Sequence, residues 1–468
     1  MRNRASLRVT PLLAATFLVV ALFPSLSSQA APATAAAPRA GAVAEWLELD
    51  RKATKAKLTP KALRAARPLD MSVRASQLDQ SADGAATEAS GEPVSVAPSA
   101  PAARAGAATK LDAPSREAAG ASAADYPYVR TEVTDTVSYP NRTHGKLFML
   151  DAGGFPFAVC SGTSVTSDEM NLVWTAGHCV HEGGAGGDFF PGFAFIPGYR
   201  NGAEPYGVWF AERVVTTPEW AANADFDYDV AAMVMEPNGG TELGDVVGTR
   251  GIRFNQDPDQ FYNAYGYPAA PPFDGEKMYR CDADLGLTLG SGSLAPMGIG
   301  CDMTGGSSGG GWIVGLEFVQ SVNSFKIVGD PEFEEVMFGP QMRADALEVY
   351  TEATGGEPEE DTTPPKLTKV TDGPDPFTPL AKKKRKTTIK FTLNELAVVV
   401  LKIKNKSGKT VYKIPATELS PDRYFTKWNG KHFKSGKVVK AGTYTYKITA
   451  TDMADNSASK SKQVTVKR

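Results

Sequence analysis

Histidine is scarce in this sequence, with four residues among 468. Any imidazole that serves as a general base must therefore be His144, His178, His181 or His432. Long apolar runs are also missing after the N-terminal region, which excludes later membrane spans. The basic residues near the C-terminus are not interleaved with aromatic ones, so we expect no nucleic-acid binding.

Cysteine is equally scarce, and all four residues lie between Cys160 and Cys301. An even number within one segment of an exported chain predicts two disulfide bonds inside one domain. We expect Cys160 to pair with Cys179 and Cys281 with Cys301, because each pairing closes a short loop. Each bond would contribute about 3 kcal/mol in chain-entropy terms.

The N-terminus has the features of a secretory signal peptide. Three arginines within the first eight residues precede an apolar run over 12–26, and small residues follow up to Ala30. This order predicts a signal peptide over residues 1–30. A membrane anchor would need about 20 uninterrupted apolar residues, and Pro24 breaks the run. We therefore expect a secreted, extracellular protein.

Composition divides the rest of the chain into four parts, since 468 residues exceed the usual size of a single core. Residues 31–125 are rich in Ala, Ser, Pro and Gly, which predicts a mostly disordered propeptide or linker with a short helix within 43–66. Short β-rich runs over 126–352 predict an all-β barrel or sandwich. Residues 353–366 are an acidic, proline-rich linker, and 367–468 form a separate module.

This last module is strongly basic. From Asp361 onward there are 24 Lys and Arg against 8 Asp and Glu, although the net charge of the whole chain is −3. Apolar alternation over 397–403 and 444–450 predicts a small β-sandwich. Its charge suits binding to an anionic cell-surface polymer, but we favour an ordinary solvated strand edge for the lysine run 382–386.

A histidine and an aspartate adjoin apolar runs of the middle segment. His178 stands near the end of the run VWTAGHC, where small residues let an imidazole lie against the backbone. Asp229 precedes a buried apolar strand, so its carboxylate can accept a hydrogen bond from a histidine Nδ1. Asp227 is the alternative partner. The alternation of Asp225 with these two residues also leaves a calcium loop open as a less favoured interpretation.

Ser308 lies in the glycine-rich run TGGSSGGGW. Glycines on both sides allow a tight turn that brings two backbone N–H groups near a reacting carbonyl. A serine hydroxyl needs a base to take its proton, and the base needs a third group to orient it. His178, Asp229 and Ser308 fill these roles. Ser307 is the alternative nucleophile, but Ser308 is the serine followed directly by glycines.

The same residues also match parts of two other classes of site. The G-x-S-x-G pattern around Ser308 is also typical of α/β-hydrolases, but there the histidine follows the serine, and His432 lies in the predicted C-terminal sandwich. A zinc site built from His178, His181 and cysteines fits no common spacing. We therefore expect neither a metal nor a cofactor. We expect His144 and His432 to be solvated.

The runs TAGHC and GSSGG around His178 and Ser308 resemble the trypsin-like serine peptidases. With GKLF and CSG before the histidine, the resemblance is strongest to the bacterial branch that includes glutamyl endopeptidases, and it covers about 145–325. It implies a double six-stranded β-barrel, a catalytic triad and an oxyanion hole formed by the N–H groups of Gly306 and Ser308. The predicted fold is thus all-β, with a small β-sandwich after the peptidase domain.

The sequence departs from that family at several positions. Ser307 stands where an aspartate usually pairs with the new N-terminus after activation. Asn323 stands where glutamyl endopeptidases have a histidine, so glutamate specificity is not supported. Asp302 is a candidate for the base of the substrate pocket, with Asn323 and Ser324 as further pocket residues; there it would select Arg or Lys.

The C-terminal segment is similar to the Ig-like modules related to flagellar hook-capping proteins, through the runs WNGK and AGTYTY. That similarity implies an accessory sandwich without chemistry of its own. The sequence therefore predicts a secreted serine endopeptidase, made as a zymogen, with protein or peptide substrates. The alternatives are an inactive adhesion protein that binds through the Ig-like module, and an esterase that uses the same triad.

Overall fold

The computed structural model describes residues 45–49, 55–69, 71–74, 91–100, 109–110, 126–290, 292–315, 317–356, 363–381, 384–395, 397–419, 422–452 and 456–467. The predicted signal peptide lies outside these ranges, as does much of the predicted propeptide. No helix among the described residues is long and apolar enough to cross a membrane.

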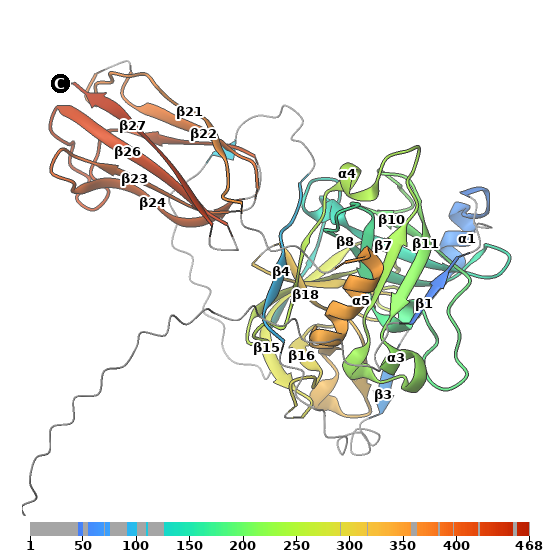
Figure 1. Ribbon diagram of the computed structural model, residues 1–468. Helices are drawn as coiled ribbons and strands as arrows, with labels where there is room; N and C mark the ends of the chain where they lie inside the picture. Colours follow the sequence, from blue (N-terminus) through green and yellow to red (C-terminus); the bar gives the residue numbers. More distant parts are fainter. Residues whose placement is uncertain are drawn as a thin grey trace, which may run out of the picture. The chain divides into compact units, whose positions relative to one another are not determined.

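The first half of the predicted peptidase domain forms a closed barrel (Figure 1). Six strands close it because β11 pairs with both β10 and β12. In barrel order these strands are β7 (His144–Leu150), β8 (Pro156–Val165), β9 (Leu172–Thr175), β12 (Ala231–Met235), β11 (Trp209–Thr216) and β10 (Gly192–Pro197). Nearly every residue of β7 and β8 is buried, so both faces of these strands pack against other parts of the domain.

A second sheet is built from the following half of the domain. Its path is β20 (Val336–Gly339), β16 (Met297–Gly300), β15 (Tyr279–Thr288), β14 (Phe261–Gly266), β17 (Gly311–Val314), β18 (Phe318–Val322) and β13 (Gly251–Phe254), and β6 (Tyr128–Glu132) pairs with β15. The all-β double-barrel prediction is confirmed. Short helices connect the strands: η2 (Asn141–Thr143), η3 (Gly177–Cys179), α3 (Pro218–Asn223), η4 (Phe226–Tyr228), α4 (Leu243–Val247) and η5 (Pro331–Phe333).

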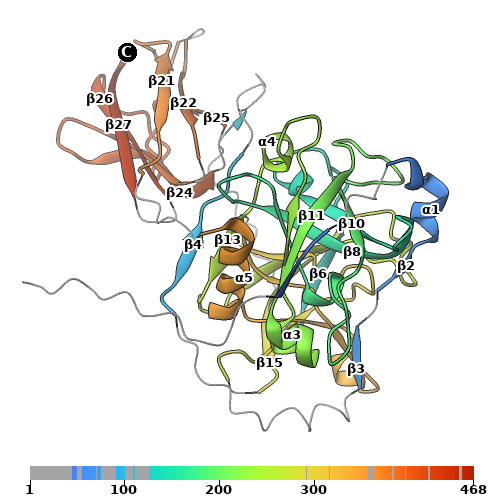
Figure 2. The same cartoon turned by 45° about the vertical axis from the view of Figure 1, so that its right-hand side comes forward.

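One longer helix, α5 (Ala344–Thr354), packs on the first barrel against β11 and β12 (Figure 2). Ala346, Val349, Tyr350 and Ala353 are its buried residues, and their spacing places them on one face of the helix. Its end at Gly355, whose φ is 76°, follows the common left-handed termination.

Both predicted disulfide bonds are present. Cys160 of β8 is bonded to Cys179 of η3, and Cys281 of β15 is bonded to Cys301 after β16. They close loops of 19 and 20 residues in sequence separation. The first bond ties the turn that carries His178 to the barrel wall.

Several segments before residue 126 add strands to these sheets. β1 (Glu45–Glu48) pairs with β11, β2 (Arg67–Pro68) with β8, β3 (Ser72–Arg74) with β19 (Lys326–Val328), and β4 (Val94–Val96) with β13. The prediction of a helix within 43–66 is therefore wrong for Glu45–Glu48, because these residues pair with the edge of β11. Helix forms only at η1 (Lys55–Lys57) and α1 (Pro60–Ala65), where Thr59 caps and Pro60 begins α1.

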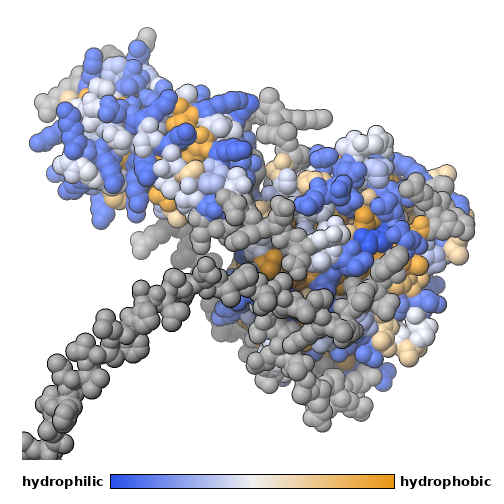
Figure 3. Space-filling view, viewed as in Figure 1, coloured by the Kyte–Doolittle hydropathy of each residue, from blue (hydrophilic) through white to orange (hydrophobic). Residues whose placement is uncertain are grey.

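The C-terminal segment forms the predicted β-sandwich. One sheet has the order β21 (Leu367–Gly373), β22 (Thr387–Leu393), β25 (Arg423–Trp428) and β5 (Thr109–Lys110), and the other has β24 (Thr410–Leu419), β23 (Ala397–Lys404), β26 (Gly442–Thr451) and β27 (Ser457–Val466). Trp428 is fully buried between them, with Phe377 and Tyr444 at its edges. The face of this segment that Figure 3 shows is mainly hydrophilic, in agreement with its many lysines.

The first turn of α5 yields a prediction about pH. Burial, with the carboxylates of Glu219 and Glu348 nearby, raises the pKa of Asp345 from 3.8 to about 7. The folded state thus holds this proton more tightly than the unfolded state, so its contribution to stability is greatest below pH 4 and is lost as the pH rises to about 7. We expect Asp345→Asn to raise the free energy of unfolding at pH 8 by about 2 kcal/mol.

This gain should shrink toward pH 4 and vanish below it, where Asp345 becomes protonated in the unfolded state as well as in the folded state. Urea unfolding at pH 4, 6 and 8 measures it. Asp284→Asn, on an exposed position of β15, is the matched control and should show no such trend. Equal effects of the Asp345 substitution at all three pH values would contradict the prediction.

Candidate active site

His178 is held in a fixed position by its turn. β9 ends at Thr175, and η3 carries His178 directly before the disulfide-bonded Cys179. Gly177 is needed there, because a Cβ at this residue would lie 2.8 Å from the Trp220 ring. The side chain of His178 is almost completely buried, with 2% of the residue exposed.

Asp229 orients this imidazole. It follows η4 and directly precedes the buried strand β12. Its Oδ2 lies 2.8 Å from Nδ1 of His178, and its Oδ1 accepts a hydrogen bond of 2.8 Å from the backbone N–H of the same residue. An ionised carboxylate only accepts, so the proton of the neutral ring must be on Nδ1. The Nε2 atom is then left with its lone pair free to accept a proton.

The buried Nε2 of His178 has no hydrogen-bond partner within the described residues. Asp227, the alternative partner in the sequence, is placed differently: its backbone N–H bonds to the side chain of Asp225. Burial, together with the Asp225 carboxylate, raises the pKa of Asp227 to about 7. Of the two carboxylates, the one that contacts His178 is that of Asp229.

The loop of Ser308 lies against the histidine turn. The carbonyl of Ser308 accepts a hydrogen bond of 2.7 Å from the N–H of Ser161, the residue after Cys160. A Cβ at Gly309, whose φ is 76°, would come within 2.0 Å of Thr175 Oγ1, so only glycine allows this approach. Gly306, with φ of 95°, makes the turn before the serines. The loop is thereby held close to the turn of His178.

The two serines of this loop have different environments. The hydroxyl of Ser307 donates a hydrogen bond of 2.8 Å to the carbonyl of Thr304, and 1% of Ser307 is exposed. Its hydroxyl is therefore committed to holding the loop, at the position where the family usually has an aspartate. Ser308 therefore stays the predicted nucleophile of the two serines.

Asn323 supports the serine loop instead of lining a pocket. This fully buried residue donates from Nδ2 to the carbonyls of Tyr265 at 2.8 Å and Ser307 at 2.9 Å, and its Oδ1 accepts from Trp312 Nε1 at 2.8 Å. All of its polar atoms are thus used inside the protein. The side chain of this predicted pocket residue therefore contacts other residues of the protein.

Ser324 also differs from the expected pocket role. Its hydroxyl donates to Oδ2 of Asp229, so this carboxylate accepts hydrogen bonds from both the histidine and the serine. Sequence reasoning missed this partner, because the two residues are 95 positions apart. The side chain of Ser324 therefore supports the histidine–aspartate pair.

Asp302 carries a charge that is already paired. Its Oδ2 accepts a hydrogen bond from the guanidinium of Arg130 on β6, which forms an ion pair with it. The Asp302 carboxylate also helps burial to raise the pKa of Tyr128 to about 12. A carboxylate neutralised by its own chain is poorly suited to attract a basic substrate side chain, so the expected selection of Arg or Lys loses its support.

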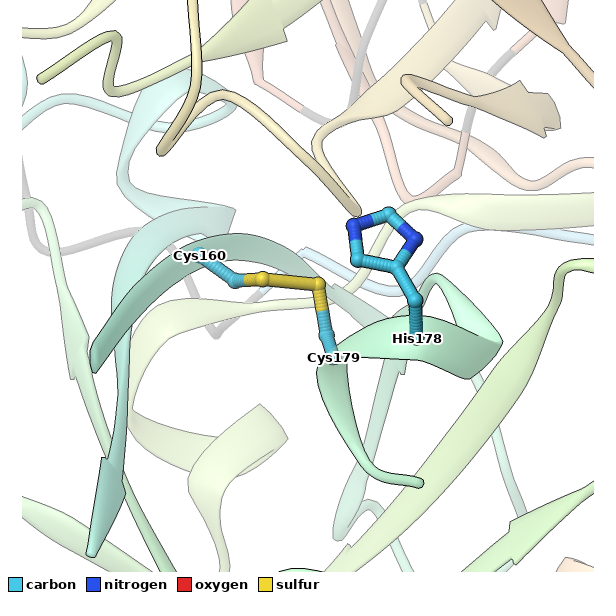
Figure 4. Close-up of side chains that lie close together, drawn as sticks. All are labelled: Cys160, His178 and Cys179. Atoms are coloured by element: carbon cyan, nitrogen blue, oxygen red, sulfur yellow. A yellow bond between two sulfur atoms is a disulfide. The ribbon is translucent and has the colours of Figure 1, made fainter. Parts of the chain in front are cut away.

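Metal-ligating side chains come together at one place in the described part of the chain. Cys160, His178 and Cys179 have their ligand atoms within 4.8 Å of one another (Figure 4). The two sulfur atoms are bonded to each other, so neither is a thiolate that zinc could use. The group is a disulfide beside an imidazole.

The other histidines have structural surroundings. The prediction that His144 is solvated is wrong, because only 2% of the residue is exposed. Its Nδ1 lies 3.0 Å from Thr163 Oγ1, and its Nε2 lies 3.1 Å from the buried guanidinium of Arg250. Burial and this guanidinium hold the pKa of His144 well below its usual value. His181 accepts at Nδ1 from the N–H of Gly183, so neither residue is placed to act on Ser308.

The chain is similar to several solved proteases. Protease Anisep from Arthrobacter nicotinovorans is 37% identical, over 49% of this chain and 100% of that chain, with a TM-score of 0.44. Thermostable serine protease AL20 from an extremophilic microorganism is 40% identical, over 46% and 97%, with a TM-score of 0.42. A Glu endopeptidase is 19% identical, over 48% and 96%, with a TM-score of 0.40.

Since two solved proteases are at least 37% identical to it over 97% or more of their own length, the chain belongs to the chymotrypsin-fold serine proteases. Residues 377–453 match the model of the FlgD Ig-like domain. No curated protein matches the chain.

The contacts of Asn323 predict its effect on stability. Asn323→Ala removes one hydrogen bond from each of two buried carbonyls and leaves the indole N–H of Trp312 without its partner, so we expect the free energy of unfolding to fall by about 3 kcal/mol. Asn238→Ala is the control, since it removes one side-chain hydrogen bond, to Val208, at an exposed residue. Urea unfolding measures both. A loss below about 0.5 kcal/mol for Asn323→Ala would show that the network is not needed.

Proposed function

We propose that the protein is a secreted serine endopeptidase that cleaves peptide bonds through an acyl-enzyme. The observation that carries this proposal is the double hydrogen bond between Asp229 and His178, which leaves Nε2 as a proton acceptor beside the loop of Ser308. This arrangement supplies the base and its orienting group, and the serine loop supplies the nucleophile.

The proposed reaction has two halves. Ser308 Oγ attacks the carbonyl carbon while His178 Nε2 takes its proton, and the N–H groups of Gly306 and Ser308 stabilise the negative charge on the carbonyl oxygen. His178 then gives the proton to the leaving amine. Water attacks the acyl-enzyme in the same way and releases Ser308. Asp229 stays ionised and stabilises the imidazolium in both halves.

We further propose the division into a signal peptide over 1–30, a propeptide or linker over 31–125, the peptidase domain over 126–352, a linker over 353–366 and the Ig-like module over 367–468. Two disulfide bonds support export, since such bonds persist in oxidising compartments. We assign the Ig-like module an accessory role. Along β23 its lysines Lys402 and Lys404 are exposed, which supports a solvated surface.

Labelling with a fluorophosphonate tests the nucleophile, because the reagent bonds only to an activated serine. We expect the processed protein to be labelled at Ser308, with the site located by peptide mass spectrometry. Ser308→Ala should abolish the label, whereas Ser307→Ala should keep it. If correctly folded, processed protein is not labelled, the inactive adhesion protein becomes the better interpretation. Comparing ester and peptide substrates separates the peptidase from the esterase.

The role of Asp229 predicts a specific kinetic change. Asp229→Asn reverses the hydrogen-bond preference at Nδ1 and favours the wrong imidazole tautomer, so we expect kcat to fall by about 10⁴-fold. KM should change much less, because the residue does not contact substrate. Asp227→Asn is the matched control and should retain most activity. Similar losses for both variants would mean that the base is not oriented by Asp229.

A further inference from the structure

An N-terminal segment crosses the proposed active site. We call residues 67–69 and 71–74 the N-terminal strap; they contain β2 and β3 (Figure 2). β2 pairs in parallel with Ala158 and Val159 of β8, directly before the disulfide-bonded Cys160. β3 pairs in parallel with β19, directly after Ser324 and Phe325. The strap thus binds to strands on both sides of the Ser308 loop.

Between these two strands, the strap contacts the serine loop itself. The N–H of Leu69 donates to the carbonyl of Val159 at 3.1 Å, and the carbonyl of Leu69 accepts from the N–H of Gly306 at 3.3 Å. That N–H group is one of the two proposed oxyanion donors. Further along, the carbonyl of Met71 accepts from the N–H of Lys326 at 3.1 Å. A substrate carbonyl cannot use the Gly306 donor while Leu69 holds it.

The side chains of the strap alternate as a bound strand requires. Met71 and Val73 pack against a cluster of buried apolar residues, whereas Ser72 and Arg74 are exposed. The cluster is formed by Phe325, Ile327, Val336 and Phe338. Backbone pairing with alternate side chains in an apolar site is the general way in which an extended peptide binds to a sheet edge.

Burial of the reactive groups is consistent with a covered site. Only 5% of Ser308 and 2% of His178 are exposed. A tethered segment also has a high effective concentration, in the mM range for a short linker, so weak individual contacts suffice to keep it bound. Parallel pairing is slightly less stable per residue than antiparallel pairing, which keeps such a segment displaceable.

We propose that the N-terminal strap is an intramolecular inhibitor, which occupies the peptide-binding cleft beside Ser308 until it is released. This inference rests on the proposed peptidase function and adds its regulation. Release requires loss of the Leu69 contacts with Gly306 and Val159, of the pairing between β2 and β8, and of the pairing between β3 and β19. After cleavage of the chain behind residue 74, the strap would dissociate together with the residues before it, once β1 also separates from β11.

A pair of neighbouring substitutions tests the strap in the full exported chain. Val73→Asp puts a charge into the apolar cluster, whereas Ser72→Asp puts the same charge on the exposed side of the same strand. We expect fluorophosphonate to label Ser308 slowly in the intact wild type and in Ser72→Asp, and at least tenfold faster in Val73→Asp. Mass spectrometry must show that each chain is uncut, and circular dichroism that each is folded.

Equal labelling rates in intact wild type and Val73→Asp would contradict inhibition by the strap, but they would not contradict the proposed peptidase function. Cleavage of the wild-type chain within residues 67–74 by its own Ser308 also overturns inhibition by the strap, because the segment would then be a substrate. Absence of label in every form, including chains cut after residue 74, overturns the peptidase function instead.

Amide hydrogen exchange provides a readout that does not depend on activity or on Val73→Asp folding. In the full Ser308→Ala chain, we expect the N–H groups of Leu69 and Gly306 to exchange at least tenfold more slowly than in the same chain cut after residue 74 and freed of the strap. Exchange at the same rate in both forms would show that the strap is not bound, whatever the enzyme does.

Discussion

The buried carboxylate of Asp229 is the interaction on which the site depends. It accepts hydrogen bonds from the backbone and ring of His178 and from the hydroxyl of Ser324. The histidine turn belongs to the first barrel, whereas Ser324 follows β18 of the second sheet. A fully buried charge is tolerated only when it is well paired, so this carboxylate both orients the imidazole and requires the two halves of the domain to stay together.

Close packing of glycines completes the arrangement. Gly177 lies against Trp220, and Gly309 lies against Thr175, at distances that exclude any side chain. The side chain of Asn323 then ties Ser307 of the serine loop to Tyr265 of β14 and Trp312 of β17 through three hydrogen bonds. The nucleophile loop is therefore fixed by groups from several strands before a substrate arrives, which is what an electrostatically preorganised site needs.

The proposed inhibition by the N-terminal strap uses the same fixed backbone groups of the site. The strand edges and the Gly306 N–H that a substrate would use are available to any extended backbone, including the chain's own. A composition rich in Ala, Ser, Pro and Gly predicts little structure over 31–125. Residues 72–74 nevertheless form a strand, because Met71 and Val73 pack against an apolar cluster and the backbone pairs with the edge of β19. Local composition does not predict this strand, because the free energy that orders it comes from contacts with the sheet to which it binds.

The sequence by itself determined the all-β class, the terminal sandwich, both disulfide pairs and the order His178, Asp229, Ser308, because strand alternation, turn residues and short loops are properties of near neighbours. Only the tertiary structure decided that Asn323 holds the serine loop, that Ser324 binds Asp229, that Arg130 neutralises Asp302 and that His144 is buried beside Arg250. Most of these partners lie 95 or more positions apart. Contacts at that separation are set by how two barrels pack, which no local pattern of residues encodes.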